Sequence, residues 1–294
     1  MLIHHHPLPQ DPARVVVVGG RGFIGGTLLA ALDRAGIPSL APSSVELDLA
    51  AEGAGGRLAG LLRPTDALVV LAAVTPDKGR GLAPFLRNLQ MAASVCAALE
   101  EVPPAHVVYF SSDAVYPTDV GRVTEESCAQ PPDLYGMMHL AREVMLKTSA
   151  KAPVAVLRST LVYGAGDTHN SYGPNRLRRM ARKEGRIALF GEGDETRDHI
   201  LVDDATALAL LVLRHRSTGL LNLATGRSIS YAELARKVAA LFDRPIEVVT
   251  TPRQNPITHR HFDITALRKA FPTFTLTPLD AGLARAHREM LERE

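Results

Sequence analysis

The chain has 294 residues, with 33 basic and 31 acidic side chains, a net charge of +2, and two cysteines, Cys96 and Cys128. This length accommodates one large or two smaller domains with a sizeable core. The balanced charge argues against a nucleic-acid or membrane surface, and no apolar run approaches the length of a membrane span. The cysteine count excludes a disulfide scaffold and favours a reducing, cytoplasmic compartment.

Residues 1–12 are rich in His and Pro, and we expect them to form a flexible tail. His4, His5 and His6 could in principle hold a metal, but three adjacent histidines on a mobile segment are not a formed site. His259 and His261 lack metal-ligand spacing. We therefore expect no metal.

The run Val15–Val18 predicts a strand buried on both faces, the central strand of a parallel sheet. It leads into Gly19, Gly22 and Gly25, and then into residues 27–32, which have helical apolar spacing. A strand, a glycine turn and a helix in this order favour a dinucleotide-binding turn over a glycine-rich turn without a ligand. The three glycines would permit, in order, a tight turn, a close approach to a pyrophosphate, and close packing of the helix. The helix start would offer its N–H groups to the phosphates, so the cofactor residues expected here are Gly19, Arg21, Gly22, Phe23, Ile24 and Gly25.

The second strand is expected at residues 37–41. In NAD-specific proteins of this type, an acidic residue near the end of this strand holds the ribose hydroxyls. The region Pro42–Ser44 has no carboxylate to repel a 2′-phosphate, and Arg21 could pair with that phosphate. The prediction therefore leans towards NADP, although Ser43 also tolerates NAD. Asp48 could bind an adenine amino group or be a solvated loop residue.

A third strand is predicted at residues 67–71, and the small residues after it would let a dinucleotide lie against the strand ends. The helix predicted at residues 83–99 carries Asn88 among apolar neighbours. A buried Asn must find partners, so Asn88 either bridges strand ends near the cofactor or satisfies a kinked helix. The further cofactor residues predicted are Leu71, Ala72, Ala73 and Asn88.

The fourth strand, residues 106–110, leads into Ser112 and Asp113. Catalytic groups on α/β sheets collect at the carboxyl ends of strands, so both residues are well placed. A helix follows, with Tyr135 in its first turn. Tyr135 and His139 are four residues apart and share one helical face, where they could present a phenol and an imidazole to the same ligand.

The rest of the chain continues to alternate. The predicted elements are a strand at 153–158, a basic helix at 175–183, strands at 187–190 and 219–223, and helices at 201–213, 231–242, 262–271 and 278–291. Most charges of the basic helix are expected to be solvated, while Asn175 and Arg176 at its start could contact substrate. The pattern predicts an α/β fold, a Rossmann doubly wound parallel sheet with a smaller, interleaved C-terminal substrate lobe. The sheet domain is expected at 13–165 and 201–249, and the lobe at 166–200 and 250–294.

In these motifs, from Arg14 to about Glu289, the chain resembles the extended short-chain dehydrogenase/reductases of the NAD-dependent epimerase/dehydratase family. The resemblance is carried by the glycine turn, the Tyr135 helix, Ser111–Pro117, Leu157-Arg158 with Val162–Gly164, and Thr196–Asp204. It implies an enzyme acting on a sugar, in this group a nucleotide sugar, by hydride transfer with a nicotinamide cofactor. It also implies a homodimer formed through the helices that start near Ala83 and Asp133.

The resemblance gives Tyr135 the role of acid/base and Ser112 that of holding the reacting oxygen, beside Asp113. A phenol needs nearby positive charge to act as a base near neutral pH, and the family supplies it with a Lys four residues after the Tyr. Here that residue is His139, which could still bind the nicotinamide ribose. Three interpretations remain: a working enzyme with an altered proton relay, which we favour, a cofactor-binding protein without turnover, or another basic residue in the role of the Lys.

Dehydratases of the family carry an Asp-Glu pair after the Ser/Thr, and here Ala114 replaces the Glu. A dehydratase is therefore disfavoured, because elimination needs a second acid/base. An epimerase, a reductase and a dehydrogenase remain, with a non-catalytic NAD(P)-binding regulatory or scaffold protein as the alternative. By the resemblance Arg197 would bind the nucleotide diphosphate, unless it pairs with a neighbouring Asp. Arg260 is a second candidate phosphate ligand.

Overall fold

The structure is a computed structural model that describes residues 1–118, 120–167, 173–253 and 256–293. The chain forms two compact units, and each draws on several stretches of the sequence. Unit 1 comprises Met1–Pro117, Glu125–Ser159 and Ala205–Leu223, and unit 2 comprises Thr118–Thr124, Thr160–Asp204 and Ala224–Glu294. The interleaving was expected, but residues 224–249, which we had expected in the sheet domain, belong to unit 2.

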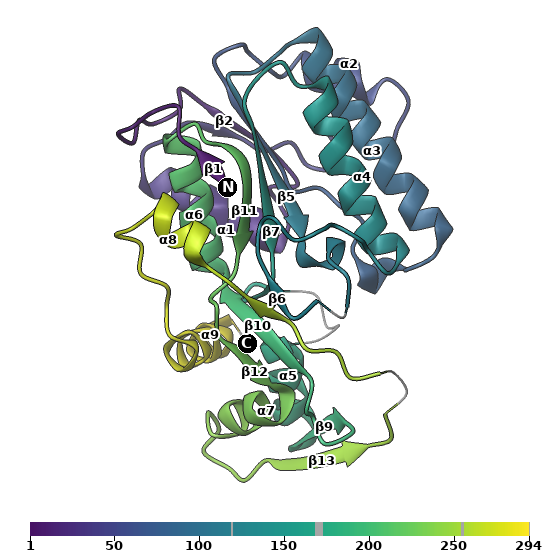
Figure 1. Cartoon of the computed structure of the whole chain (residues 1–294), viewed down its shortest axis with the longest axis vertical. Coiled ribbons are helices and arrows are strands. Elements are labelled where there is room, and N and C mark those ends of the chain that lie inside the picture. The colour runs from purple at the N-terminus through teal and green to yellow at the C-terminus, as the bar shows by residue number, and fades with distance from the viewer. Residues whose placement is uncertain (119, 168–172, 254–255, 294) are drawn as a thin grey trace. The chain divides into compact units, whose positions relative to one another are not determined.

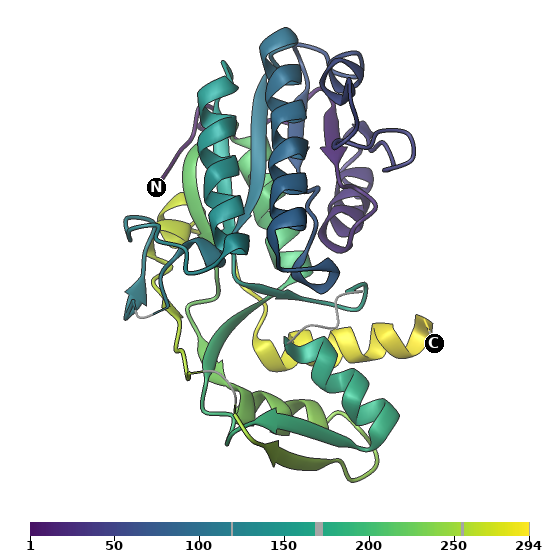
Figure 2. The same ribbon diagram turned by 90° about the vertical axis from the view of Figure 1, so that its right-hand side faces the viewer.

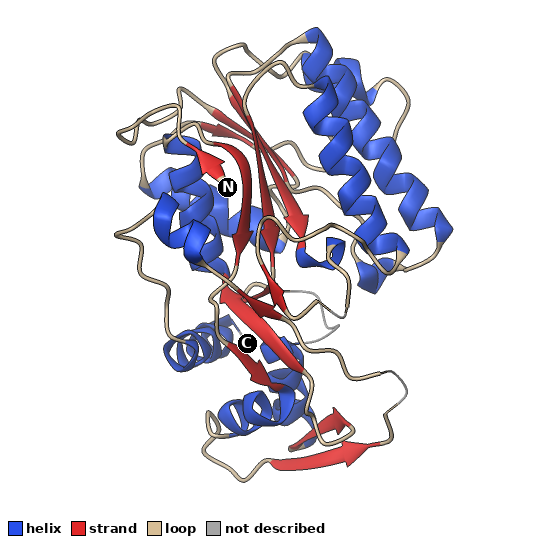
Figure 3. Ribbon diagram, in the orientation of Figure 1, coloured by secondary structure: helices blue, strands red, loops and turns tan. Residues whose placement is uncertain are grey.

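Unit 1 is built on a seven-stranded sheet with the strand order β1-β11-β7-β5-β4-β2-β3, drawn as red arrows in Figure 3. All neighbouring pairs are parallel except β1 and β11. This arrangement confirms the predicted doubly wound α/β fold. The strands are β1 (Leu2–Ile3), β2 (Val15–Val18), β3 (Ser39–Leu40), β4 (Ala67–Val70), β5 (His106–Ser112), β7 (Val154–Ser159) and β11 (Thr218–Leu223).

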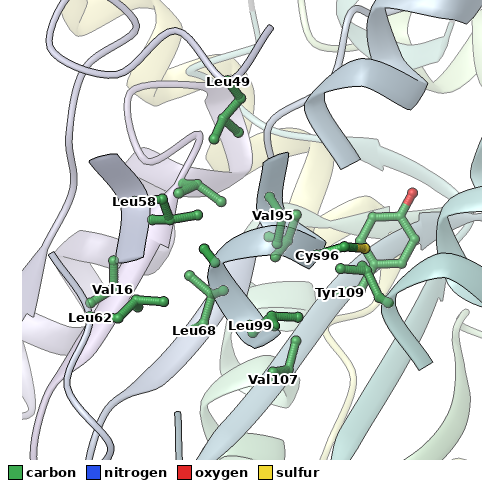
Figure 4. Close-up of a cluster of buried hydrophobic side chains, with 14 of the residues drawn as sticks. Val16, Leu49, Leu58, Leu62, Leu68, Val95, Cys96, Leu99, Val107 and Tyr109 are labelled. Atoms are coloured by element: carbon green, nitrogen blue, oxygen red, sulfur yellow. The ribbon is translucent and has the colours of Figure 1, made fainter. Parts of the chain in front are cut away.

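Helices cover both faces of this sheet (Figures 1 and 2). One face carries α1 (Phe23–Arg34) and α6 (Val202–Arg214), and the other carries α2 (Ala54–Ala59), α3 (Leu82–Glu101) and α4 (Leu134–Ser149). Between the sheet and this second layer lies a buried apolar cluster that includes Val16, Leu68, Leu99 and Tyr109 (Figure 4). Because helices bury both sides, the central strands are uniformly apolar and do not alternate.

The direction of winding changes at β2. The first long strand of the chain, β2, is paired on one side with β3 and on the other with β4, so the chain leaves it in both directions. In open parallel sheets, ligands bind beyond the carboxyl ends of the strands at such a switch point. The glycine turn at residues 19–25 follows β2 directly and therefore lies at this point.

The first twelve residues are ordered against unit 1, and our expectation of a flexible tail was wrong. Leu2–Ile3 pair with β11 as an antiparallel edge strand. The backbone N–H groups of His5 and His6 donate to the carbonyl of His215, at 3.1 and 3.0 Å. The reason lies in the end of α6, whose last carbonyls have no helical partner and take these donors instead.

Helix α3 has the length and apolar composition of a membrane span, whereas we had expected no apolar run of that length. Among the described residues it is the one helix long and apolar enough to span a membrane, by length and composition alone. The core helix of a globular domain meets the same criterion, and α3 packs against both α2 and α4. It also carries Cys96, which is buried and unpaired.

Unit 2 contains a three-stranded sheet, β12-β10-β8, and the pairs β13-β9 and β14-β6. Its helices α5, α7 and α9 enclose an apolar cluster that includes Tyr163, Leu234 and Leu283. The helix predicted at 262–271 is shorter, because His261–Phe262 form a strand beside Arg122–Val123. The elements are β6 (Arg122–Val123), β8 (Leu161–Tyr163), α5 (Gly173–Glu184), β9 (Arg186–Phe190), β10 (Thr196–Leu201), β12 (Ser228–Ser230), α7 (Tyr231–Ala239), β13 (Glu247–Thr251), β14 (His261–Phe262), α8 (Thr265–Ala270) and α9 (Leu279–Arg293).

Candidate active site

The glycine turn after β2 requires glycine for two distinct steric reasons. Gly19 has φ +90°, and a Cβ there would lie 2.5 Å from the backbone N of Ala72, just after β4. A Cβ on Gly25 would lie 2.7 Å from Cα of Gly20, so this glycine lets α1 approach the turn. The backbones of the turn, the helix and the end of β4 thus come together as closely as the sequence predicts.

The first turn of α1 carries no capping side chain. Gly22 is its N-cap in an extended conformation, no side chain caps the helix start, and the first turn contains no acidic residue. The N–H groups at this end and the positive end of the helix dipole are therefore left for an anion. Phe23, Ile24 and Gly25 form this turn, and its chemistry fits the pyrophosphate of a dinucleotide.

A carboxylate from outside Pro42–Ser44, that of Glu46, reaches this region. The Glu46 side chain accepts the backbone N–H of Ser43 at 2.7 Å, and Ser43 Oγ in return accepts the N–H of Glu46 at 3.2 Å. This reciprocal capping holds the Glu46 carboxylate 3.9 Å from Arg21 and lowers its pKa, mainly through the Ser43 hydroxyl. The lean towards NADP rested on the absence of such a group and loses that support.

Asp48 and Asn88 have well-defined partners. Asp48 accepts a hydrogen bond from the N–H of Ala50 at 3.0 Å and forms an ion pair with Arg87 at 3.0 Å. Asn88 is buried, and its amide exchanges two hydrogen bonds with the backbone of Val74, at 2.9 and 3.0 Å. Asn88 therefore fixes the segment that follows β4. Its Nδ2 also donates to the carbonyl of Pro84 in the same helix at 3.0 Å, so both roles considered for it remain.

Ser112 and Asp113 lie where β5 ends and the short 3₁₀ helix η2 (Asp113–Val115) begins. Ser112 is the N-cap of η2, and its Oγ accepts the N–H of Ala114 at 3.1 Å. The contact from Ser112 Oγ to Asp113 is longer, at 3.5 Å. Both polar side chains are half-buried at the carboxyl end of the sheet.

Tyr135 is brought to this strand end by a glycine that we had not singled out. Asp133 caps α4 by accepting the N–H of Gly136 at 2.9 Å. A Cβ on Gly136 would collide with the Ala114 carbonyl, lying 2.8 Å from its carbon. The first turn of α4 can therefore pack directly on η2, which brings the Tyr135 turn to the segment that follows Ser112.

His139 differs from what we expected. The side chain is only 4% exposed, and its Nδ1 lies 2.7 Å from the hydroxyl of Tyr109. Its Nε2 is buried and has no hydrogen-bond partner in the described part of the chain. Its ring stands edge-on to Tyr135, with 4.8 Å between ring centres. Burial, together with the charge of Arg142, lowers the pKa of His139 to about 3. His139 is therefore neutral near pH 7 and does not take over the positive charge that the Lys supplies in the family.

A permanent positive charge lies one turn further along α4. Arg142 is 0% exposed, donates to the carbonyl of Ala72 at 2.8 Å, and lies 3.4 Å from Oδ1 of Asn88. Its guanidinium carbon is 5.2 Å from the ring centre of Tyr109. The sequence signal was the spacing, because Arg142 follows Tyr135 by seven residues and shares its helical face.

A second buried charge pair ties α4 to the strands. Arg158 of β7 makes a bidentate contact with Glu143, at 2.9 and 2.8 Å, and Ser111 donates to the same carboxylate at 2.6 Å. The guanidinium also lies 4.8 Å from the ring centre of Tyr116. This network orients the ends of β5 and β7. From the sequence, Ser111, Tyr116 and Arg158 had been named as parts of motifs, but Glu143 had not.

In unit 2, the two residues predicted at the start of α5 differ in environment. Asn175 is buried, and its Nδ2 donates to Gly164 and Asp167, both at 2.8 Å, so it fixes that loop. Arg176 is half-buried, with its guanidinium carbon 5.8 Å from the ring centre of Phe190.

The two phosphate ligands predicted further along unit 2 are both held by the protein. Arg197 pairs with Glu195 at 2.6 Å and donates to the carbonyl of Thr258 at 2.6 Å, so its partner is not a neighbouring Asp. Asp198 is buried and accepts N–H groups from Thr225 and Arg227, among others. Arg260 is buried, and its backbone N–H donates to the carbonyl of Thr196 at 3.2 Å. Within the described part of the chain, no group of three His, Cys, Asp or Glu could hold a metal ion.

A parallel sheet with a glycine turn at its switch point and an uncapped helix beyond it defines a Rossmann-type dinucleotide-binding protein. The chain belongs to the NAD dependent epimerase/dehydratase family, whose model matches residues 15–224. The Rossmann fold, the family and its nicotinamide cofactor class agree with what the sequence predicts.

Known proteins resemble the chain in part or along its length. It is 33% identical over 124 residues to dTDP-L-rhamnose 4-epimerase from Burkholderia thailandensis, a match that covers 40% of this chain and 34% of that protein. The chain thus spans about a third of that relative's length. The structure of MoeE5 in complex with UDP-glucuronic acid and NAD is similar with a TM-score of 0.82 and 26% identity, over 96% of this chain and 100% of that one. A GDP-L-fucose synthetase from Naegleria fowleri bound to NADP shares the fold, with a TM-score of 0.84 and 17% identity over 100% and 98% of the two chains.

Proposed function

We propose that this protein is an NAD(P)-dependent epimerase or oxidoreductase acting on a nucleotide sugar. The observation that carries the proposal is the close packing at Gly136, which brings the first turn of α4, with Tyr135, to the segment after Ser112. The glycine turn belongs to the same sheet. A hydroxyl and a phenol at the carboxyl end of a dinucleotide-binding sheet suit hydride transfer at a sugar carbon.

In this proposal the nicotinamide supplies a hydride acceptor and donor when it is bound. Tyr135 moves the proton to or from the reacting hydroxyl. Ser112 holds the same oxygen, with its own Oγ oriented by the N–H of Ala114. His139 donates a hydrogen bond to a cofactor hydroxyl through Nε2, which is buried and has no partner among the residues that the structure describes. Buried polar atoms are almost always paired, so this orphaned nitrogen fits a ligand oxygen.

Relatives support the reaction class. The partial match to a dTDP-L-rhamnose 4-epimerase and the likeness to a protein bound to UDP-glucuronic acid and NAD both favour a nucleotide sugar. Among the reactions of the family, 4,6-dehydration is disfavoured by Ala114. We therefore place epimerisation first, with reduction or dehydrogenation of the same substrate class next.

Substrate contacts are proposed for Asn175, Arg176, Arg197 and Arg260 of unit 2. Arg197 is the strongest candidate for a diphosphate, since a guanidinium binds phosphate in a bidentate manner. Its pairing with Glu195 and Thr258 means that a phosphate would have to displace an existing partner. Asn175 acts indirectly, by holding the loop at residues 164–167.

Both NAD and NADP remain candidate cofactors. Arg21 favours a 2′-phosphate, whereas the carboxylate of Glu46 favours the free 2′-hydroxyl of NAD. The opposing charges lie 3.9 Å apart and are both exposed. We propose that their balance sets the preference.

We further propose a cytoplasmic homodimer formed through α3 and α4. Each helix exposes large apolar side chains, including Leu86 on α3 and Met137 and Val144 on α4. Exposed apolar faces of this kind mark association surfaces, and both cysteines are free, as in a reducing compartment.

One observation favours the alternative, a cofactor-binding protein without turnover. The neutral His139 leaves Tyr135 without a positive charge at the neighbouring helix position. The test is turnover of a panel of UDP-, dTDP- and GDP-sugars with NAD and NADP, followed by separation of epimers. We expect a product with the wild-type protein and losses of at least about a hundredfold with Ser112→Ala and Tyr135→Phe. Turnover that neither substitution changes would refute the assignment, and cofactor binding without any product would establish the alternative.

A further inference from the structure

The hydrogen bond between Tyr109 and His139 has a preferred direction. Tyr109 is buried, and burial raises the pKa of its phenol to about 12, so the hydroxyl keeps its proton. Its hydroxyl bonds to Nδ1 of His139 at 2.7 Å. If the imidazole donated this bond, the phenol proton would be left without an acceptor in a buried site, which is unfavourable. The phenol therefore donates to Nδ1, and the single proton of the neutral imidazole lies on Nε2.

Arg142 opposes a second proton on this ring. Its guanidinium is always charged, fully buried, and fixed by the Ala72 carbonyl at 2.8 Å. The groups that face His139 are Tyr135 and Arg142 from α4 and Tyr109 from β5. No carboxylate is among these groups. The carboxylate nearest to them in sequence, Glu143, is bound by Arg158 and Ser111; it acts against Arg142 at the phenol of Tyr109, whose pKa it raises, and it is not among the charges that act on His139.

We propose that Tyr109 and Arg142 are positioning residues that hold His139 as a neutral imidazole with its proton on Nε2, and that Arg142 carries the fixed positive charge of this site. The inference rests on the proposed function in one respect, the group that accepts the hydrogen bond from Nε2 of His139, which is a ribose hydroxyl of a nicotinamide cofactor. The state of the ring itself follows from the contacts of the protein alone.

This arrangement separates two tasks. His139 gives one hydrogen bond of fixed direction to the ligand, and it gives the same bond throughout the neutral pH range. Arg142 supplies a charge that does not titrate, at a residue seven positions after Tyr135 instead of four. A substitution at Tyr109 should therefore alter the position of the imidazole proton, while a substitution at Arg142 should alter the pH at which a second proton binds.

The test is ¹⁵N NMR of the histidine ring nitrogens in the full chain, without cofactor. The His139 signals are assigned by their loss in His139→Gln. For the wild type we expect a protonated Nε2 and an unprotonated Nδ1 at every pH from 5.5 to 8. In Tyr109→Phe the two tautomers should mix. In Arg142→Met the pKa of the ring should rise from about 3 by at least about one unit, so its signals should shift before those of the wild type when the titration is extended down to about pH 4, while Arg142→Lys should restore the wild-type behaviour.

Several outcomes would overturn the inference: a proton on Nδ1 in the wild type, a wild-type ring that titrates between pH 5.5 and 8, or an Arg142→Met ring that behaves as the wild type. Tyr109→Phe keeps the shape of the core, so it provides a folded variant if Arg142→Met does not fold. Where turnover is measurable, the pH profile of kcat should gain an inflection in Arg142→Met that Arg142→Lys lacks. The ring signals do not depend on activity, so failure of the proposed enzyme function would be distinguished from failure of this inference.

Discussion

The glycine turn and the surroundings of His139 belong to the same unit but are specified in different ways. The turn, residues 19–25, is fixed by its own backbone and by one contact with Ala72. The surroundings of His139 are assembled from side chains of α3, α4 and β5. The first region offers backbone N–H groups, which do not depend on the side chains there except through steric collision or a proline. The second depends on the protonation and pairing of individual side chains.

The difference is sharpest in the response to acid, where we expect the largest effect. The pKa values of His106 and His139 are lowered by burial to about 4 and about 3, whereas an unfolded His titrates near 6.5. Between these values the unfolded chain binds more protons, so the stability present above pH 6.5 is lost as the pH falls towards 4. We expect unit 1 to lose on the order of 5 kcal/mol between pH 6.5 and 4.5, measured by urea unfolding.

His106→Gln should reduce this pH dependence, because one of the two groups is gone. His261→Gln is the control, since His261 is exposed and is not among the groups that act on His106, and it should leave the slope unchanged. A stability that stays flat between pH 6.5 and 4.5 would show that these histidines are not neutral in the folded protein.

The next expected effect is a loss of turnover without a loss of cofactor affinity. We expect Tyr135→Phe to lower turnover by about a thousandfold, because it removes the proposed acid/base. The affinity for NADH or NADPH should change by less than about threefold, since the glycine turn is untouched. A Tyr135→Phe protein that loses cofactor affinity in proportion to its turnover would contradict this separation of roles.

The buried charge pair of α4 and β7 should matter for stability. Arg158→Met leaves the Glu143 carboxylate buried without its ion pair, so we expect a loss of about 3 to 4 kcal/mol in the free energy of unfolding. The double variant Arg158→Met/Glu143→Leu removes both charges and should regain most of the loss. If the double variant is no more stable than Arg158→Met, the loss comes from packing and not from the orphaned carboxylate.

Two neighbouring glycines at the glycine turn and the start of α1, Gly25 and Gly26, differ in the space around a Cβ. A Cβ on Gly25 would meet the backbone of Gly20 at 2.7 Å, whereas one on Gly26 would meet nothing closer than 3.9 Å. Gly25→Ala should therefore reduce cofactor affinity at least about tenfold. Gly26→Ala should leave affinity unchanged and stabilise α1 by about 0.5–1 kcal/mol. Equal effects of the two substitutions on binding would refute the steric argument.

The smallest expected effect is on cofactor choice. Glu46→Gln removes the carboxylate near Arg21 and should shift the ratio of NADPH to NADH affinity towards NADPH by several-fold, because exposed charges interact weakly in water. Glu52→Gln, another exposed carboxylate of this region, serves as the control. A ratio that Glu46→Gln leaves unchanged would remove Glu46 from cofactor selection.

These contrasts explain what could be predicted from the sequence. The strands at 15–18 and 106–112, the glycine turn and the Tyr135 helix were predictable because each is encoded by adjacent residues. The neutral state of His139 was not, because it depends on Tyr109, thirty residues earlier, and on burial. Glu46 was missed because its carboxylate turns back three residues to Ser43. The ordered conformation of residues 1–12 could not be predicted, because it depends on hydrogen bonds to the end of α6, some two hundred residues later.

The most direct test of the account is a fluorescence titration of the purified protein with NADH and NADPH between pH 6 and 9. We expect binding of at least one of them, with an affinity that changes by less than about threefold over this range, because a His139 with a pKa of about 3 stays neutral throughout. An affinity that changes about tenfold between pH 6 and 7.5 would contradict a neutral His139. Failure to bind either nucleotide would contradict the proposed enzyme function.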